Sequence, residues 1–260
     1  MKRTGRKENL DAVPHYHEIR DALAQPGCPF CRLQAVSADR FIDAVLWEQV
    51  NDPGTRAELN QARGYCQQHA WLLVRPGAAL GVAILTRDVI KTLLDALDST
   101  PVEKASRSVF HSLRRGIDDG RVSRATAELT ANLHPQTACP LCLHVQDLEL
   151  AYSHTLLAHL DGPGSLAEAY HASDGLCLPH FRQTLARVPS SAEADLLVAA
   201  QRSVWQRLEN ELVEFIRKND HRFRDETFGP ERDAWRRALE SISGPPPRSE
   251  SGRHGLTQSI

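Results

Sequence analysis

The sequence predicts an all-α protein built as two related helical halves. Apolar residues recur at helical spacing along most of the 260-residue chain, and no segment shows the strict alternation of apolar and polar residues that marks a half-buried strand. One set of cysteine and histidine residues also occurs twice with the same internal spacing. Self-similarity at a fixed period indicates an internal duplication.

In the first half, the helix signal is strongest after Cys31. A broad apolar stripe at helical spacing continues to residue 50, and the sequence NDPG at 51–54 ends it. Shorter helices are expected at 55–61 and from Cys66 to residue 73, followed by a longer one at 78–98.

The second half repeats this order. We expect a helix at 101–113, a charged, turn-rich connector at 114–120, a long helix from Cys142 to residue 160, and a short helix after Cys177 that ends before Pro189. The repeat indicates a first half at 12–100, carrying metal site 1, and a second half at 101–244, carrying metal site 2. The polar ends, residues 1–11 and 245–260, are expected to be disordered.

The longest helix is expected at 190–218, because Ser190 with Glu193 three positions later forms a capping-box pattern ahead of a 3–4 apolar spacing. A last helix is expected from Pro230 to residue 242, ending at Gly244. The apolar stripes are interpreted as core positions rather than as cofactor contacts.

Composition narrows the class of protein. Hydrophobic residues make up 41% of the chain and charged residues 25%, with a formal net charge of −2, so nothing favours nucleic acid or an anionic membrane as a partner. The basic N-terminus has no apolar run behind it, and no stretch has the length of a membrane span. We therefore expect a cytoplasmic protein whose thiols are reduced.

All six cysteines belong to two matching patterns, CPxC followed by CxxH. In each pattern the first cysteines of the two pairs lie 38 positions apart, and the second pattern follows the first by 111 positions. The eight candidate metal ligands are Cys28, Cys31, Cys66, His69, Cys139, Cys142, Cys177 and His180.

The chemistry of metal binding explains this spacing. Side chains at i and i+3 in a turn that enters a helix can point at one position, so two such turns supply four ligands for a tetrahedral ion. Proline after the first cysteine suits the first helical position. Glycine ahead of Cys66 and Cys177 permits a tight, left-handed turn.

The sequence leaves two pairings open. The equal spacings favour one site within each half, joining Cys28 and Cys31 to Cys66 and His69. The alternative joins Cys28 and Cys31 to Cys177 and His180.

Zinc is the expected metal, with two Zn²⁺ ions per chain, because three cysteines and one histidine form a common structural zinc set. An iron–sulfur cluster with the same ligands is the alternative. Buried reduced cysteines, disulfides and a thioredoxin-type redox pair explain the doubled pattern less well, and neither CxxC is followed by the histidine that covalent haem requires.

No catalytic motif of the esterase, P-loop, dinucleotide-binding or zinc-protease type occurs in the chain. Four protein ligands also leave a metal no open position for water or substrate. His154 and His159, with Glu149 nearby, could form a second polar site, but we interpret them as ordinary helix-surface residues. The charged segment at 218–226 is interpreted as a connector whose Phe223 packs inward, with a docking loop as the alternative.

The segments CPFCRL, GYCQQHAWLL, CPLC and GLCLPHF make the chain similar to an uncharacterised family of bacterial helical proteins with a duplicated CPxC…GxCxxH arrangement. The resemblance spans about residues 12–243, including the stretch around Phe223 and Trp235. It implies a helical fold and metal binding by the eight ligands, and it implies no activity.

Three functions are compatible with these observations. The first is a non-enzymatic, zinc-stabilised helical protein that binds a protein partner as an adaptor or regulator. The second is an iron–sulfur protein that senses redox state or transfers electrons. The third is a helical enzyme with a pocket between the two halves.

Overall fold

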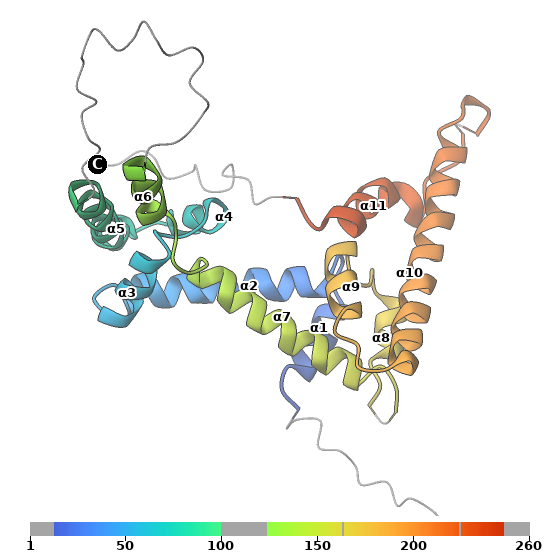
Figure 1. Cartoon of the computed structure of the whole chain (residues 1–260). Coiled ribbons are helices and arrows are strands. Elements are labelled where there is room, and N and C mark those ends of the chain that lie inside the picture. The colour runs from blue at the N-terminus through green and yellow to red at the C-terminus, as the bar shows by residue number, and fades with distance from the viewer. Residues whose placement is uncertain (1–12, 100–123, 163, 224, 247–260) are drawn as a thin grey trace, which may run out of the picture. The chain divides into compact units, whose positions relative to one another are not determined.

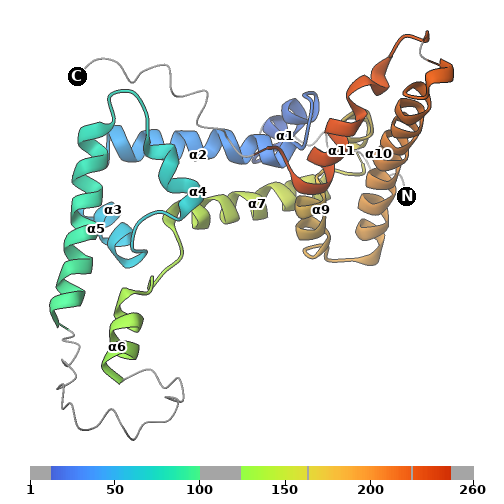
Figure 2. The same cartoon turned by 90° about the horizontal axis from the view of Figure 1, so that it is seen from above.

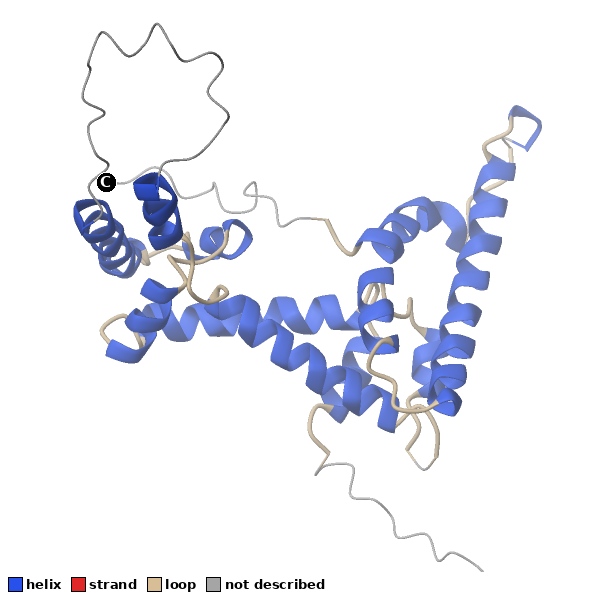
Figure 3. Cartoon of the chain, in the orientation of Figure 1, coloured by secondary structure: helices blue, strands red, loops and turns tan. Residues whose placement is uncertain are grey.

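Helices form all the regular secondary structure of the described residues of this computed structural model (Figures 1 and 3). The structure describes residues 13–99, 124–162, 164–223 and 225–246. The α-helices are α1 (Tyr16–Leu23), α2 (Pro29–Trp47), α3 (Pro53–Gln61), α4 (Gln67–Ala70), α5 (Ala79–Ser99), α6 (Arg124–Leu133), α7 (Pro140–Ala158), α8 (Ala167–Ala172), α9 (Leu178–Leu185), α10 (Ser191–Lys218) and α11 (Ala234–Ser243). Short 3-10 helices lie at η2 (Trp71–Leu73), η3 (His221–Phe223) and η4 (Pro230–Asp233).

The chain forms two compact units that do not coincide with the expected halves. Of the described residues, unit 1 contains those from 13 to 38 and from 145 to 246, and unit 2 contains those from 39 to 144. Each unit therefore takes residues from both expected halves, because the long helices α2 and α7 each begin in one unit and end in the other. Unit 2 is one continuous segment, inserted between the two segments of unit 1.

Unit 1 has a core that joins the start of α2 to helices from the second segment. Ile19, Phe30, Leu156, Tyr170 and Leu197 are fully buried in it. The long helix α10 packs on α8 and α11, and α11 also packs on α9 (Figure 1). Two of the cysteines are members of this apolar cluster, so the candidate metal ligands in unit 1 belong to its core.

Unit 2 has a smaller core. It is centred on Val45 in α2, Leu59 in α3, and Leu85 and Val89 in α5. Helix α3 packs on α5, and α6 packs on α5 as well (Figure 2). Helix α4 has only four residues, none of them buried.

The all-α prediction is confirmed for the described residues, and the expected long helices lie within a few residues of their predicted bounds. Ser190 caps α10, because its side chain accepts a hydrogen bond from the Glu193 amide at 3.3 Å. Helices α1, α6 and α8 were not predicted. Helix α1 follows His15, whose backbone is left-handed and whose side chain does not cap the helix, and α8 has only six residues.

Some predictions fall on residues outside the described ranges. They are the helix at 101–113, the connector at 114–120 and the disordered termini, apart from residues 245 and 246. The internal duplication stays a prediction. Among the described helices, none is both long and apolar enough to cross a membrane.

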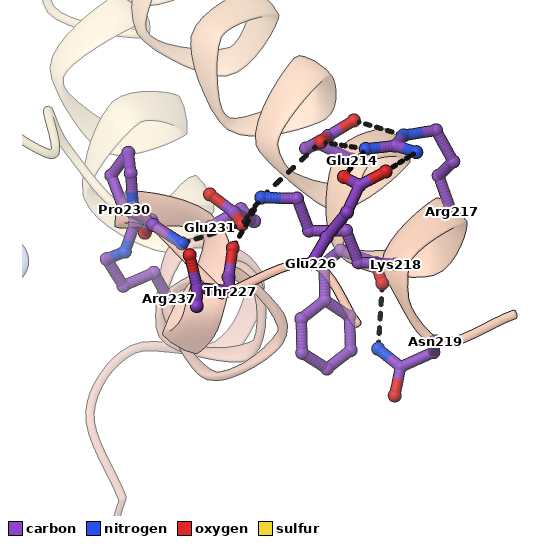
Figure 4. Close-up of polar contacts among 11 residues, drawn as sticks. Glu214, Arg217, Lys218, Asn219, Glu226, Thr227, Pro230, Glu231 and Arg237 are labelled. Carbon is purple, nitrogen blue, oxygen red and sulfur yellow. Dashed lines mark hydrogen bonds and ion pairs between the residues drawn. The ribbon is translucent and has the colours of Figure 1, made fainter. Parts of the chain in front are cut away.

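An ion-pair cluster fastens the connection between α10 and α11 (Figure 4). The buried Glu231 carboxylate accepts hydrogen bonds from the Lys218 ammonium at 2.7 Å and from the Gly229 amide at 2.8 Å. The Arg217 guanidinium pairs with Glu214 and Glu226 and lies 4.6 Å from the centre of the Phe223 ring. Phe223 and Glu226 thus contact Arg217 of α10, and the role of the segment at 218–226 stays a prediction.

Substitutions at this cluster test its contribution to stability. The hydrogen bond from Lys218 lowers the pKa of Glu231 from 4.5 to about 2. The folded state therefore gains stability above pH 4.5 and loses it as the pH falls toward 2. We expect Glu231→Gln to lower the stability at pH 7, and the gap from the unsubstituted protein to stay constant from pH 8 to 5 and to narrow below 4.5. Denaturant unfolding at several pH values measures this gap.

Lys218→Met provides the matched comparison. It leaves the buried Glu231 carboxylate without its cation, so it should destabilise the protein more than Glu231→Gln does. Equal losses for the two variants, with no pH dependence, would contradict the assignment of the pair.

Candidate metal centres

Two groups of three cysteines and one histidine meet in the structure. Site 1 combines Cys28, Cys31, Cys177 and His180, and site 2 combines Cys66, His69, Cys139 and Cys142. Site 1 lies in unit 1 and site 2 in unit 2. All eight residues predicted from the sequence are present in these two groups, and within each group the ligand atoms lie within 4.8 Å of one another.

The preferred pairing was wrong. The CPxC pair of the first motif joins the CxxH pair of the second motif, and the reverse holds for the other site. Cys28 lies at the start of α2, which has 19 residues and carries the chain about 28 Å from it. In unit 1 the start of α2 instead contacts the latter part of α7, where the Phe30 and Tyr152 ring centres are 5.8 Å apart.

Unit 2 has the reciprocal arrangement. The Phe41 ring, in the latter part of α2, lies 4.9 Å from the His144 ring at the start of α7. Each CxxH turn follows one of these helices after a connection that contains one shorter helix, α3 or α8, and it meets the CPxC turn at the start of the other helix. The alternative that the sequence left open is the arrangement found.

Local sequence explains how each turn presents its ligands. Both CPxC cysteine pairs lie at the start of a 19-residue helix, where proline occupies the first helical position. Cys66 and Cys177 are the N-cap residues of α4 and α9, with similar backbone angles of φ −63°, ψ 163° and φ −67°, ψ 158°. The exposed amide groups of a helix start favour thiolate over thiol.

The separations of the ligand atoms match a single tetrahedral ion. Bonds of ~2.3 Å to sulfur and ~2.0 Å to nitrogen place two sulfurs about 3.8 Å apart, and a sulfur and a nitrogen about 3.5 Å apart. The Sγ atoms of Cys31 and Cys177 are 3.7 Å apart, as are those of Cys66 and Cys142. The Nδ1 atom of His180 lies 3.2–3.5 Å from the three thiols of site 1.

Site 2 has the same geometry. The His69 Nδ1 atom lies 3.6 Å from the Cys139 sulfur and 3.4 Å from the Cys142 sulfur. In both sites, therefore, the histidine faces the thiols through Nδ1. The residues of both groups fit a metal ion with four protein ligands.

The thiols of each group are too close together to be ionised at once without a cation. In site 1, hydrogen bonds with the Cys177 and Cys28 sulfurs raise the pKa of Cys31. In site 2, burial and the charge of Cys139 raise the pKa of Cys142 to about 12. A bound metal needs thiolates, so it must displace these protons, and metal affinity should fall as the pH falls.

The two histidines differ in their electrostatic surroundings. Burial alone lowers the pKa of His69. Burial also opposes the charged form of His180, but its hydrogen bonds with the Cys177 and Cys28 sulfurs outweigh this effect and raise its pKa to about 10. Without a cation, His180 is thus charged beside Cys28, whose pKa is lowered by hydrogen bonds with Cys177, Cys31 and His180 despite its burial.

Sequence reasoning missed the residues that hold the Cys177 turn. The Leu176 backbone amide donates to the side-chain oxygen Oε1 of Gln201 at 3.1 Å, and it also lies 3.3 Å from the Tyr170 hydroxyl. The Gly27 amide donates to the Asp174 carboxylate at 2.7 Å, which joins the two ligand-bearing segments. The 3.6-residue apolar pattern carries no signal for these polar contacts.

The other histidines discussed from the sequence do not form a metal site. His154 is exposed, as expected. The surface interpretation was wrong for His159 and Glu149, which are buried: the His159 ring lies 5.3 Å from the Tyr16 ring, and Glu149 pairs with Arg187 at 3.6 Å. In the part of the chain that the structure describes, only sites 1 and 2 gather enough suitable ligand atoms for a metal.

Comparison with known proteins places the chain in a family. The model of a family of unknown function, DUF6062, matches residues 7–249. The chain belongs to the DUF6062 family. The expectation of an uncharacterised family is thereby confirmed.

This DUF6062 member is also similar to an uncharacterised 23.9 kDa protein, encoded in the xynA 3' region of Caldicellulosiruptor sp. (strain Rt8B.4). The two are 24% identical over 218 residues, which covers 84% of this chain and 95% of the relative. No solved structure matches the chain.

Paired substitutions test the crossed arrangement. Cys28→Ser with Cys177→Ser damages only site 1, so this double variant should retain one metal ion per chain. Cys28→Ser with Cys66→Ser damages both sites and should retain none. Metal content after purification and gel filtration distinguishes the two. If each site instead formed within one half, the first double variant would retain no metal and the second would retain one ion per chain.

Two glycines allow a matched test of the turns ahead of the ligands. Gly64 and Gly175 have φ of +97° and +64°, so alanine at either position adopts strained backbone at about 1–2 kcal/mol. An alanine Cβ at position 175 would also stand 3.1 Å from the Gln201 side chain, whereas at position 64 the nearest atom is 3.9 Å away.

We therefore expect Gly175→Ala to reduce unfolding stability by about 1–3 kcal/mol more than Gly64→Ala, because it adds overpacking to strain. Denaturant unfolding of the metal-loaded variants measures the difference. Equal losses of stability would show that the Gln201 side chain moves away from the added Cβ without lowering the free energy of unfolding.

Proposed function

We propose that this DUF6062 member binds two Zn²⁺ ions as structural elements of a non-enzymatic helical protein with a role in interaction or regulation. The observation that carries the proposal is the match of the S···S separation, 3.7 Å in each site, to a single tetrahedral ion. Three thiolates and a neutral imidazole are a common zinc set, and they leave no coordination position for a substrate.

The compactness of the groups favours one ion over a cluster. In an iron–sulfur cluster, at least two irons and bridging sulfides separate the protein ligands. Here all four ligand atoms of each site lie within 4.8 Å of one another. The redox or electron-transfer alternative therefore has weaker support than zinc.

The free space beside site 1 also favours a structural role. A cavity of about 20 Å³ is lined by Cys28, Cys177, Asp174 and Arg237, among others. That volume accommodates about one water molecule, so it offers no room for a substrate.

A protein partner is the remaining part of the proposal. Helix α11 exposes Trp235, Leu239 and Ile242, which recur every three or four residues along one face and are each more than half exposed. Aromatic and aliphatic side chains gathered on a surface are typical of protein interfaces. We propose a bacterial, cytoplasmic setting, in which reduced thiols remain available to the metal.

Elemental analysis of untagged protein, purified without air, tests the metal assignment together with a visible spectrum. We expect about two zinc ions per chain, no colour, and loss of helical circular dichroism on chelation, because metal binding is coupled to folding. Iron with sulfide and a brown colour would support the redox alternative. A folded protein with neither metal would overturn the proposal.

A further inference from the structure

The two sites form a matched pair in ligands and local backbone. Both use CPxC at the start of a 19-residue helix and CxxH at the start of a shorter one. Their S···S separations are equal, and the backbone angles of Cys66 and Cys177 differ by only a few degrees. Any difference in behaviour must therefore come from what surrounds the ligands.

Site 1 is enclosed by unit 1. Cys177, His180 and Cys28 are 1%, 7% and 9% exposed. The half-buried Cys31 is approached by the end of α11, where a Cβ added to Gly244 would stand 3.8 Å from the Cys31 sulfur. A chelator or thiol reagent therefore needs movement of the unit 1 core to reach Cys28, Cys177 and His180.

Hydrogen bonds also hold the ligand segments of site 1 in place without using the metal. Asp174 joins the Gly27 amide to the Cys177 segment at 2.7 Å. The buried Gln201 and Tyr170 side chains both meet the Leu176 amide, one residue before Cys177. Such outer partners orient ligands and raise metal affinity.

The ligands of site 2 are less buried than those of site 1, and the packing of unit 2 supports their segments less. Only Cys139 is buried, whereas Cys66, His69 and Cys142 are half-buried. The neighbouring segments are joined by the Gln136 amide, which donates to the Gln61 carbonyl at 2.8 Å, and by Arg63, which donates to the Asn132 carbonyl at 2.6 Å. Helix α4, which carries His69, buries none of its side chains.

We infer that the two metals have different roles: site 1 releases its metal slowly, whereas site 2 exchanges its metal with the solution and its cysteines are accessible to thiol reagents. This inference rests on the proposed binding of zinc at both sites. Loss of the ion from site 2 frees α4 from the start of α7, while the unit 1 core keeps its own ion. Unit 2 is thus the part of the chain whose structure responds to zinc supply.

A timed release experiment on the full chain tests the inference. Protein loaded with two zinc ions is mixed with a coloured zinc chelator, 4-(2-pyridylazo)resorcinol, and sampled with pulses of N-ethylmaleimide for peptide mapping. We expect one zinc to leave quickly and the other roughly 10–100-fold more slowly, the range that outer partners contribute to metal affinity. Cys66 and Cys142 should be alkylated with the fast step, and Cys28, Cys31 and Cys177 with the slow one.

Three variants assign the steps. His69→Ala should bind one zinc and show only slow release. His154→Ala, which replaces an exposed histidine outside both sites, should keep both steps. Gln201→Met keeps the length of the side chain but removes the acceptor of the Leu176 amide, so it should speed only the slow step.

The outcomes separate this inference from the function on which it rests. Release of both ions in one step, or alkylation of Cys28 and Cys177 before Cys66, would overturn the difference between the sites while leaving zinc binding intact. Protein that carries no zinc at the start would contradict the proposed function itself.

Discussion

A tetrahedral ion needs four ligand atoms in one small volume, and in this chain those atoms come from distant segments. Site 1 joins residues up to 152 positions apart, and site 2 joins residues up to 76 positions apart. The ligands of site 2 all lie within the loop that site 1 closes. This nested order accompanies the division of the chain into a continuous unit 2 and a unit 1 built from the two flanking segments.

The two loops that the sites close differ in how much the packing of the chain stabilises them. The entropy of closing a loop grows slowly with its length, so the long loop of site 1 costs little more than that of site 2. What differs is the support that each closure receives. In unit 1, Cys28 and Cys177 are part of the apolar cluster, so packing and metal binding stabilise the same contacts. In unit 2 the core lies around Val45 and Leu85, and the half-buried ligands depend more on the ion.

Electrostatics couple the sites to their metals. Where three thiols meet at one position, at least one of them holds its proton when no cation is present, as the raised pKa values of Cys31 in site 1 and Cys142 in site 2 indicate. A divalent ion replaces those protons and relieves the repulsion among the thiolates. Since a shared fold or family does not specify a function, the functional argument for this DUF6062 member rests on the chemistry of these sites.

The sequence alone was sufficient for the eight residues that form the two candidate metal sites, for the long helices and for the capping of α10. These features are local: the i, i+3 spacing of cysteine and histidine, the 3.6-residue apolar period and the Ser190 cap act over a few residues. Helix α6 was not predicted because its only large apolar residues are Leu129 and Leu133, too few for a recognisable apolar stripe.

Tertiary structure alone decided which of the eight residues form each candidate site. The two CPxC turns are chemically equivalent, as are the two CxxH turns, so spacing could not distinguish the crossed pairing from the uncrossed one. The contacts of Phe30 with Tyr152 and of Phe41 with His144 decided it, because they bring the start of each long helix to the latter part of the other. The same packing buried one site and left the other half-exposed, a difference that identical motifs cannot encode.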